Sequence, residues 1–204
     1  LRHFFAAGEK FGSSTSTRAA RAPPDSCFRG RFLLFLLALL PLLGALAPAL
    51  AIRFGRNASA LAAGAVTLSA LVVLASMVPG VMRGEVFTAS VPWIPVLGLN
   101  ASLFLDPLGL MFAGMILGIG LLIIIYARFY LAAADPMGRF FTYLLLFQGA
   151  MLGIVLSDNV LLLLIFWELT SLSSFLLIGF WRHSPEARQG ARMALFVTGA
   201  AVWP

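Results

Sequence analysis

Apolar residues in this chain form long runs that short polar turns separate. A run of about 20 apolar residues can cross the hydrocarbon core of a bilayer as one α-helix, whose backbone groups are hydrogen-bonded within the segment. The pattern therefore predicts an all-α fold, a polytopic transmembrane helical bundle with five complete spans and part of a sixth. The expected complete spans are residues 32–52, 58–81, 105–127, 139–156 and 160–181, and the partial span is residues 185–204.

Helix start signals support two of these boundaries. Asp106 and Pro107 suit the start of the third span, because aspartate can cap a first turn and proline lacks an N–H that would be unpaired there. Ser184 and Pro185 repeat this signal where we expect the sixth helix to begin.

Two parts of the pattern depart from a simple row of straight helices. Pro41 and Pro48 lie inside the first span on nearly the same face, and each is expected to kink it. Residues 82–100 form a longer and more polar connection between the second and third spans. Trp93 within this connection suits an interfacial anchor or a short extended segment on the membrane surface.

Residues 1–31 form a separate zone, the tail, which is rich in Ser, Thr, Arg and Pro and has no apolar periodicity. Such a composition cannot bury enough apolar surface to fold, so we expect a disordered or extraneous tail followed by a transmembrane domain over residues 32–204. Many Arg and Ser residues with few acids are also typical of a targeting peptide, which is the alternative interpretation.

The composition agrees with a membrane protein and excludes several other classes. Of 204 residues, 61% are hydrophobic and 11% are charged, which a soluble domain of this size would not show. Cys27 is the single cysteine, and His3 and His183 are far apart, so we expect neither a disulfide framework nor a metal site. No phosphate-binding loop or Ser/His/Asp set is present, so we expect no cofactor and no hydrolase.

The net charge is +6, and outside the tail the arginines are dispersed at the ends of the apolar runs rather than gathered on one nucleic-acid-binding face. One side of the predicted membrane holds Arg53, Arg56, Arg128, Arg139, Arg182, Arg188 and Arg192, and the other side holds Arg83 alone. Cytoplasmic loops carry the excess of basic residues, so the first side is expected to be cytoplasmic and the first span to start outside. The basic residues of the tail would then lie on the wrong side, which favours an extraneous tail.

Glu168 lies near the middle of the fifth span and is the strongest candidate for chemistry in the chain. A carboxylate at the centre of a transmembrane helix costs roughly 2.5–3.5 kcal/mol on insertion scales, so neighbouring groups must offset that cost. Helical spacing places Ser171 beside Glu168, and Thr170, Ser173 and Ser174 add small hydroxylated surface for helix contacts. We interpret Glu168 as a proton or cation relay, and a satisfied structural hydrogen bond is the alternative.

Several segments carry a resemblance to a known family. They are FLDPLGL from Phe104, LGIGLLIIIYARFYL from Leu117, FTYLLLFQGAMLGIVLSDN from Phe141 and FWELTSLSSFLLIGFW from Phe166. Together they resemble the antiporter-like, proton-pumping membrane subunits, and more narrowly the A subunit of the Mrp-type multisubunit monovalent cation (Na+)/proton antiporter of bacteria. The resemblance covers roughly residues 31–199, and WELTSLSSFLLIG is its most specific part.

The resemblance implies a multi-pass subunit of the bacterial inner membrane that works with other subunits and exchanges Na+ or a similar ion for protons. It implies a secondary transporter subunit rather than an enzyme, and it makes this sequence the N-terminal fragment of a longer helical bundle. It also makes Glu168 the acid of the ion-transfer path, paired with a lysine from a later helix. That lysine is not in this sequence, whose only lysine is Lys10.

Three further polar residues are supporting candidates. Related subunits often carry a lysine in the sixth span, at the position of Met193 here, and the adjacent Arg192 could hold Glu168 ionised or else snorkel to the interface. His183, at the cytoplasmic end of the Glu168 helix, suits a proton-entry group or an exposed interfacial histidine. Gln148 is the only strongly polar side chain inside the fourth span, where an interhelical hydrogen bond is favoured over a role in the ion path.

Two alternatives stay open. The first is the homologous membrane-arm proton-pumping subunit of respiratory NADH dehydrogenase, although LTSLSSF after the glutamate favours the Mrp-type interpretation. The second is a nonfunctional fragment, because residues 199–204 depart from the glycine-rich continuation expected of the family.

The charge distribution predicts on which side of the membrane each loop lies. Single cysteines placed at Arg56 and Asp158, in a background that lacks Cys27, should react with an impermeant thiol reagent from opposite sides. Labelling of intact cells and of inverted vesicles measures this. Labelling of both positions from outside intact cells would contradict the five-span topology.

Overall fold

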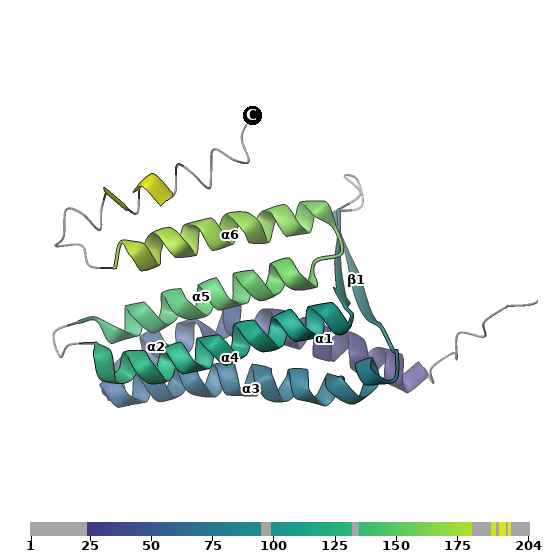
Figure 1. Ribbon diagram of the computed structural model, residues 1–204, viewed down its shortest axis with the longest axis horizontal. Coiled ribbons are helices and arrows are strands. Elements are labelled where there is room, and N and C mark those ends of the chain that lie inside the picture. The colour runs from purple at the N-terminus through teal and green to yellow at the C-terminus, as the bar shows by residue number, and fades with distance from the viewer. Residues whose placement is uncertain are drawn as a thin grey trace, which may run out of the picture.

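A computed structural model describes residues 24–94, 99–131, 135–180, 189–190, 192–194 and 196. Within these residues, five helical segments are long and apolar enough to cross a membrane. They are Gly30–Phe54, Arg56–Met82, Pro107–Tyr130, Met137–Leu156 and Val160–Ile178. They run alternately in opposite directions in a bundle (Figure 1). The predicted transmembrane helical bundle is therefore confirmed. Residues 189–190, 192–194 and 196 are helical, and the rest of the expected sixth span lies outside the described residues.

The first span consists of three helical pieces, α1 (Pro24–Gly44), α2 (Leu46–Ala51) and η1 (Ile52–Phe54). The break between α1 and α2 follows from Pro48, because a proline ring clashes with the carbonyl four residues earlier and offers that carbonyl no N–H. Pro41 lies inside α1, which continues through it. Helix α1 also begins within the predicted tail, so the helical part of this region is longer than expected.

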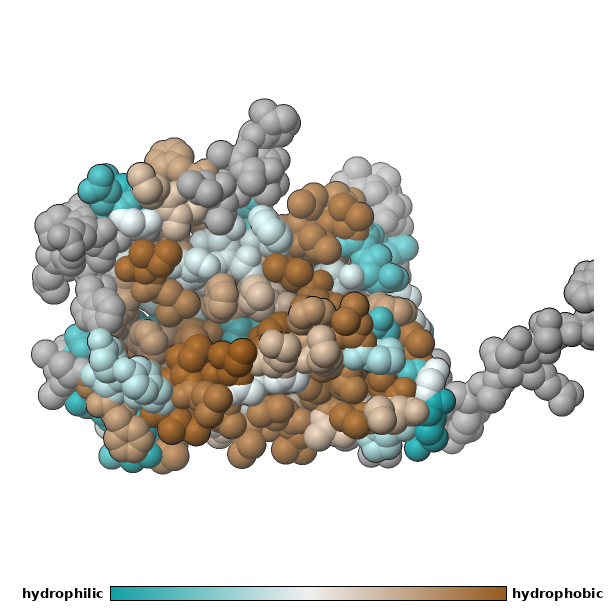
Figure 2. All heavy atoms as spheres, in the orientation of Figure 1, coloured by the Kyte–Doolittle hydropathy of each residue, from teal (hydrophilic) through white to brown (hydrophobic). Residues whose placement is uncertain are grey.

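The remaining spans are α3 (Arg56–Met82), α4 (Pro107–Tyr130), α5 (Met137–Leu156) and α6 (Val160–Ile178). Helix α5 is central, because it packs against α1, α2, α3, α4 and α6. Half of the apolar stretch of α5 is buried inside the protein, whereas a third or less of the corresponding stretch is buried in each of the other spans. The outer surface over α3 and α4 is almost continuously apolar in Figure 2, as expected for a surface that faces lipid.

Two side-chain caps fix where α4 and α6 begin. The Asp106 carboxylate accepts a hydrogen bond from the backbone N–H of Gly109 at 2.6 Å, and Pro107 occupies the first turn, as the sequence predicts. The Asn159 side chain accepts from the N–H of Leu161 at 2.9 Å. These caps hold the polar residues at the end of the bundle, where the chain turns back into the membrane.

The connection between α3 and α4 folds into an antiparallel β-hairpin of β1 (Phe87–Ile94) and β2 (Leu99–Leu105). Half-buried Phe87 and buried Ala89 alternate with exposed Thr88 and Ser90, which is the period of a strand with one covered face. The extended segment expected here is thus present, although it is a paired hairpin that the all-α description does not include. The described side chains do not extend to Trp93.

The hairpin covers one end of the bundle. Strand β2 contacts α1, α4, α5 and α6, and its Ser102 carbonyl accepts a hydrogen bond from the N–H of Asp158 at 3.0 Å. Arg53, Arg56, Arg128 and Arg139 lie at the opposite end, where α3 and α5 begin and α4 finishes. The hairpin therefore marks the end of the bundle that is poor in arginine.

Gly153 marks a close approach of α5 to α6 and allows a stability prediction. A Cβ at this position would overlap the ring of Phe166. Gly153→Ala should therefore lower the free energy of unfolding by roughly 1–3 kcal/mol, because a packed ring has to move. Gly118→Ala is the matched control, since its Cβ would meet nothing within 4 Å among the described residues. Thermal unfolding in detergent compares the two, and equal losses would contradict the predicted helix contact.

Candidate functional site

Glu168 lies at the middle of α6, and its side chain is half-buried. Its Oε1 atom is buried and has no hydrogen-bond partner among the described residues. A buried carboxylate oxygen that lacks a partner loses the solvation it had in water, so it carries a free-energy cost. The described part of the protein therefore holds a carboxylate at the middle of a long apolar helix and leaves one of its oxygens without a hydrogen-bond partner.

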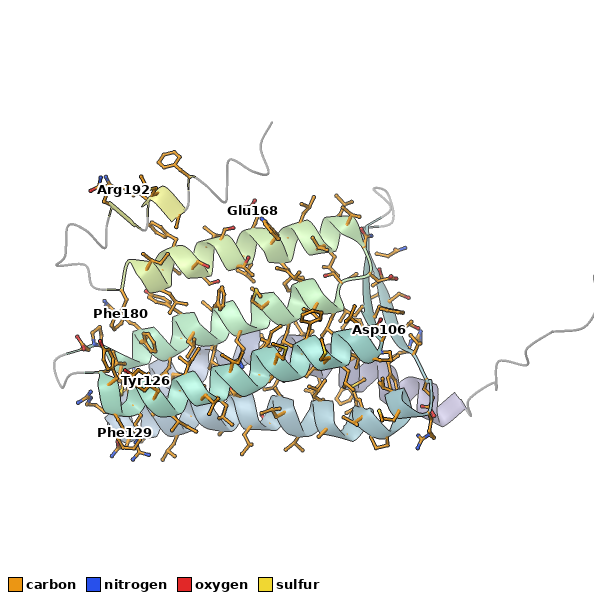
Figure 3. The ribbon with its side chains drawn as sticks, in the orientation of Figure 1. Asp106, Tyr126, Phe129, Glu168, Phe180 and Arg192 are labelled. Atoms are coloured by element: carbon orange, nitrogen blue, oxygen red, sulfur yellow. The ribbon has the colours of Figure 1, made fainter. Side chains whose placement is uncertain are left out.

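Helix geometry places Glu168 on the side of α6 that faces away from α5. The Phe166 ring packs where Gly153 of α5 leaves room, and a residue two positions further on lies about 200° around the helix. Figure 3 shows Glu168 on α6. Gly190, beyond α6 in the sequence, lies near the end of this helix, where a Cβ on Gly190 would be 3.8 Å from Ile178.

The hydroxyl groups near Glu168 donate hydrogen bonds within α6. Thr170 Oγ1 and Ser171 Oγ donate to the carbonyl of Trp167 at 2.6 and 3.2 Å. Ser173 Oγ donates to the carbonyl of Leu169 at 2.8 Å. Back-bonding of this kind satisfies hydroxyls inside an apolar helix. Thr170 and Ser171 follow Glu168 by two and three residues on the same helix. Among the described residues, however, neither hydroxyl is hydrogen-bonded to the Glu168 carboxylate.

Arg192 is exposed. Figure 3 places Arg192 toward the end of the bundle where Phe180 lies, whereas Glu168 lies at the middle of α6. The two side chains are thus apart in this view, and both interpretations of Arg192 stay predictions. His183 lies outside the described residues.

Gln148 is almost fully buried, with 2% of its surface exposed, and it joins three helices. Its Oε1 accepts a hydrogen bond from Thr67 Oγ1 of α3 at 3.1 Å. Its Nε2 donates to the carbonyl of Ile116 in α4 at 3.3 Å. Gly120 of α4 leaves room for the amide, because a Cβ there would overlap Nε2. The interhelical hydrogen bond expected of Gln148 is present.

The hydrogen-bonded group of Thr67, Gln148 and the Ile116 carbonyl, here called the polar node, lies between two apolar clusters. The cluster toward the hairpin includes Leu37, Leu74, Leu105, Leu117 and Leu152. The cluster toward the arginine-rich end includes Ala63, Ile124, Phe141, Leu144 and Leu145. The sequence did not single out Thr67. Its position along the span could have indicated the contact, because Thr67 and Gln148 each lie near the middle of a span.

Two family models match this chain. The model described as NADH-Ubiquinone oxidoreductase (complex I), chain 5 N-terminus, matches residues 93–141. The model described as NADH:quinone oxidoreductase/Mrp antiporter, TM, matches residues 157–203, which include all of α6 and Glu168.

Similar proteins include bacterial antiporter subunits. A probable K(+)/H(+) antiporter A/B subunit of Rhizobium meliloti (strain 1021) is 49% identical over 144 residues, which are 71% of this chain and 14% of the relative. The Na(+)/H(+) antiporter A1 subunit of Staphylococcus aureus (strain JH9) is 46% identical over 127 residues, which are 62% of this chain and 16% of the relative. The chain thus spans less than a fifth of the length of these relatives.

Solved structures show the same arrangement of helices. A chain of the Mrp complex from Dietzia sp. DQ12-45-1b superposes with a TM-score of 0.66 and 34% identity, covering 83% of this chain and 18% of that chain. A chain of the membrane-bound sulfane sulfur reductase, an archaeal respiratory membrane complex, gives a TM-score of 0.62 at 18% identity, covering 80% of this chain and 24% of that chain. The second likeness shows a shared fold alone.

The polar node predicts a coupled loss of stability. Gln148→Met leaves the Thr67 hydroxyl without its acceptor, and Thr67→Val leaves the Gln148 carbonyl without its donor, so each should cost about 1–2 kcal/mol. The double variant should lose less than the sum, by about 0.6–1.7 kcal/mol, because neither partner is then left unpaired. Thermal unfolding of the four proteins in detergent measures this coupling. Strictly additive losses would show that the hydrogen bond contributes nothing.

Proposed function

We propose that this chain, which belongs to the antiporter-like family of Mrp and NADH:quinone oxidoreductase membrane subunits, forms part of a subunit that exchanges a monovalent cation for protons. The observation that carries the proposal is Glu168, an acid in the middle of a transmembrane helix whose buried Oε1 has no described partner. Intramembrane acids with this placement are typical of proton and ion paths. The antiporter names of the relatives that are 49% and 46% identical support the same function.

In the proposed mechanism, Glu168 takes up and releases a proton within the bundle. Contact between Phe166 and Gly153 fixes α6 against α5, and this contact turns the carboxylate toward the opposite side. A cationic group from a helix beyond α6 would favour the ionised carboxylate, and its withdrawal would favour proton uptake. Coupling this cycle to the movement of Na+ or K+ gives exchange of the cation for protons.

The proposal includes an orientation in the bacterial inner membrane. Arg53, Arg56, Arg128 and Arg139 mark the cytoplasmic end, and the hairpin end, which holds Arg83, faces outward. Other subunits of a multisubunit antiporter complex are the expected partners. The chain acts in this proposal as part of a secondary transporter rather than as an enzyme.

A second candidate function is a proton-pumping membrane-arm subunit of a respiratory NADH dehydrogenase. The observation that favours it is the match of residues 93–141 to the model of complex I chain 5. Expression of the complete subunit together with its partners in a host that lacks Na+/H+ antiporters distinguishes the two. Restored growth in high Na+ supports the antiporter, whereas NADH-driven quinone reduction without Na+ tolerance supports the redox-driven pump.

The decisive variant of the antiporter proposal is Glu168→Gln in the complete subunit, assembled with its partner subunits. Glutamine keeps the size and one carbonyl but cannot ionise, so exchange should collapse, whereas the assembled complex should persist because an amide is cheaper to bury than a carboxylate. Glu168→Asp should retain part of the activity, because the charge remains and only its reach shortens. Na+-driven proton movement in everted vesicles, read with a pH-sensitive dye, measures the exchange.

Glu85→Gln is the matched control for this experiment. Glu85 forms an ion pair with Arg83 at 3.2 Å on the exposed hairpin end of the bundle. The Glu85→Gln variant therefore loses one negative charge, as Glu168→Gln does, but leaves the interior of the bundle unchanged. Its exchange activity should equal that of the wild-type protein. Normal exchange by Glu168→Gln would make Glu168 a structural residue and would remove the main support for the proposed function.

A further inference from the structure

A groove runs between α3 and α4 on the side of the bundle. It has a volume of about 340 Å³ and is lined by Ala60, Gly64 and Leu68 of α3 and by Leu121, Ile125 and Arg128 of α4, among others. The α3 positions from residue 60 to residue 68 cover two helical turns, which correspond to about 12 Å along the axis. The long axis of the groove therefore follows the helices, which is also the direction of a lipid acyl chain in a bilayer.

Gly64 leaves this groove open without being needed for a contact between the described helices. A Cβ on Gly64 would meet no described atom within 4 Å. By contrast, a Cβ on Gly120 would overlap Gln148 and one on Gly149 would overlap Leu42, so those glycines are needed for contact between helices. Gly64 has no such neighbour, and its missing side chain leaves space at the surface of the protein.

One end of the groove is basic and the rest is apolar. Among the described residues that line the groove, Arg128 is the sole charged one, and it is exposed near the end of α4. Its guanidinium lies 5.5 Å from the centroid of the Phe129 ring, and Tyr126 stacks on Tyr130 with centroids 5.2 Å apart. Aromatic and basic residues together are typical of the level of the lipid headgroups. Figure 3 shows Tyr126 and Phe129 at this end of the bundle, opposite Asp106.

We propose that this groove binds an anionic phospholipid, with one acyl chain between α3 and α4 and the phosphate at Arg128. The apolar walls match an acyl chain, and the single cation at the mouth matches a phosphodiester, which arginine binds through charge-assisted hydrogen bonds. The lipid belongs to the leaflet at the arginine-rich end, where Arg53 adds further positive charge. The surface above α3 and α4 is apolar (Figure 2), so a lipid can enter the groove sideways from the bilayer.

Photo-cross-linking in the complete complex tests this proposal. Phosphatidylglycerol and phosphatidylcholine that carry the same diazirine-labelled acyl chain are incorporated into nanodiscs with the complex, and cross-linked peptides are mapped by mass spectrometry. Wild-type protein should cross-link phosphatidylglycerol at residues 61–68 and 121–125, with about fivefold preference over phosphatidylcholine, as one basic contact provides. No cross-link in these segments, or equal yields for the two lipids, would overturn the proposal. Recovery of the labelled lipid only on peptides of another subunit, and not on these segments, would also overturn it.

Three variants separate the acyl chain from the headgroup. Arg128→Gln should lower the phosphatidylglycerol yield about fivefold and the phosphatidylcholine yield less, because the choline cation offsets the charge of that lipid's phosphate. Gly64→Leu should lower both yields, because a leucine side chain fills the groove. Arg139→Gln is the matched control, since Arg139 is an exposed arginine at the same end that does not line the groove. Equal effects of Arg128→Gln and Arg139→Gln would show general attraction to basic surface and would overturn the site.

Discussion

Inside the hydrocarbon of a bilayer, there is no water to form hydrogen bonds with a polar group that lacks a partner in the protein. The polar node shows how this constraint shapes the bundle. Thr67, Gln148 and the Ile116 carbonyl satisfy one another where three helices meet. The glutamine amide can reach α4 because position 120 is a glycine, so the hydrogen bonds and the close approach of the helices depend on each other. An apolar cluster lies on each side of this level.

Among the described residues, the buried Oε1 of Glu168 departs from this constraint, as does the hydroxyl of Thr142 in α5. The hydroxyls around it follow the rule, because each bonds a carbonyl of its own helix. The buried carboxylate oxygen does not follow it within the described residues. Sites that break a local rule of folding are where function is expected, since an uncompensated group is retained only for a use that offsets its cost. The contrast between satisfied hydroxyls and an unsatisfied acid on one helix supports a transport role more strongly than the acid alone does.

Hydropathy predicted the spans because a helix that crosses a bilayer must be apolar over a fixed length, whatever its neighbours are. The start of α4 at Asp106 and Pro107 could also be predicted from the sequence, because a helix cap depends only on the residues of the first turn. The pairing of Thr67 with Gln148 depends on which spans become neighbours, and a single sequence does not give this. The hairpin was missed as a hairpin because its alternation is short, covering Phe87 to Val91 in the first strand. The proposed role of Glu168 rests on the residue type and its place in the span, whereas its surroundings required the structure.

The two flanks of the bundle make different demands on whatever surrounds them. The flank over α3 and α4 is apolar along its groove and basic only at Arg128, so lipid can satisfy it completely. Helix α6 is the least buried of the five described spans, since only 17% of its apolar stretch is covered by other parts of the protein, yet it carries Glu168. Lipid offers a carboxylate neither hydrogen-bond donors nor a cation, so it would leave Glu168 unstable on that flank. We therefore expect protein to cover the Glu168 side of α6 and lipid to cover the α3–α4 side, because each surface is stable only against the neighbour that its polar groups require.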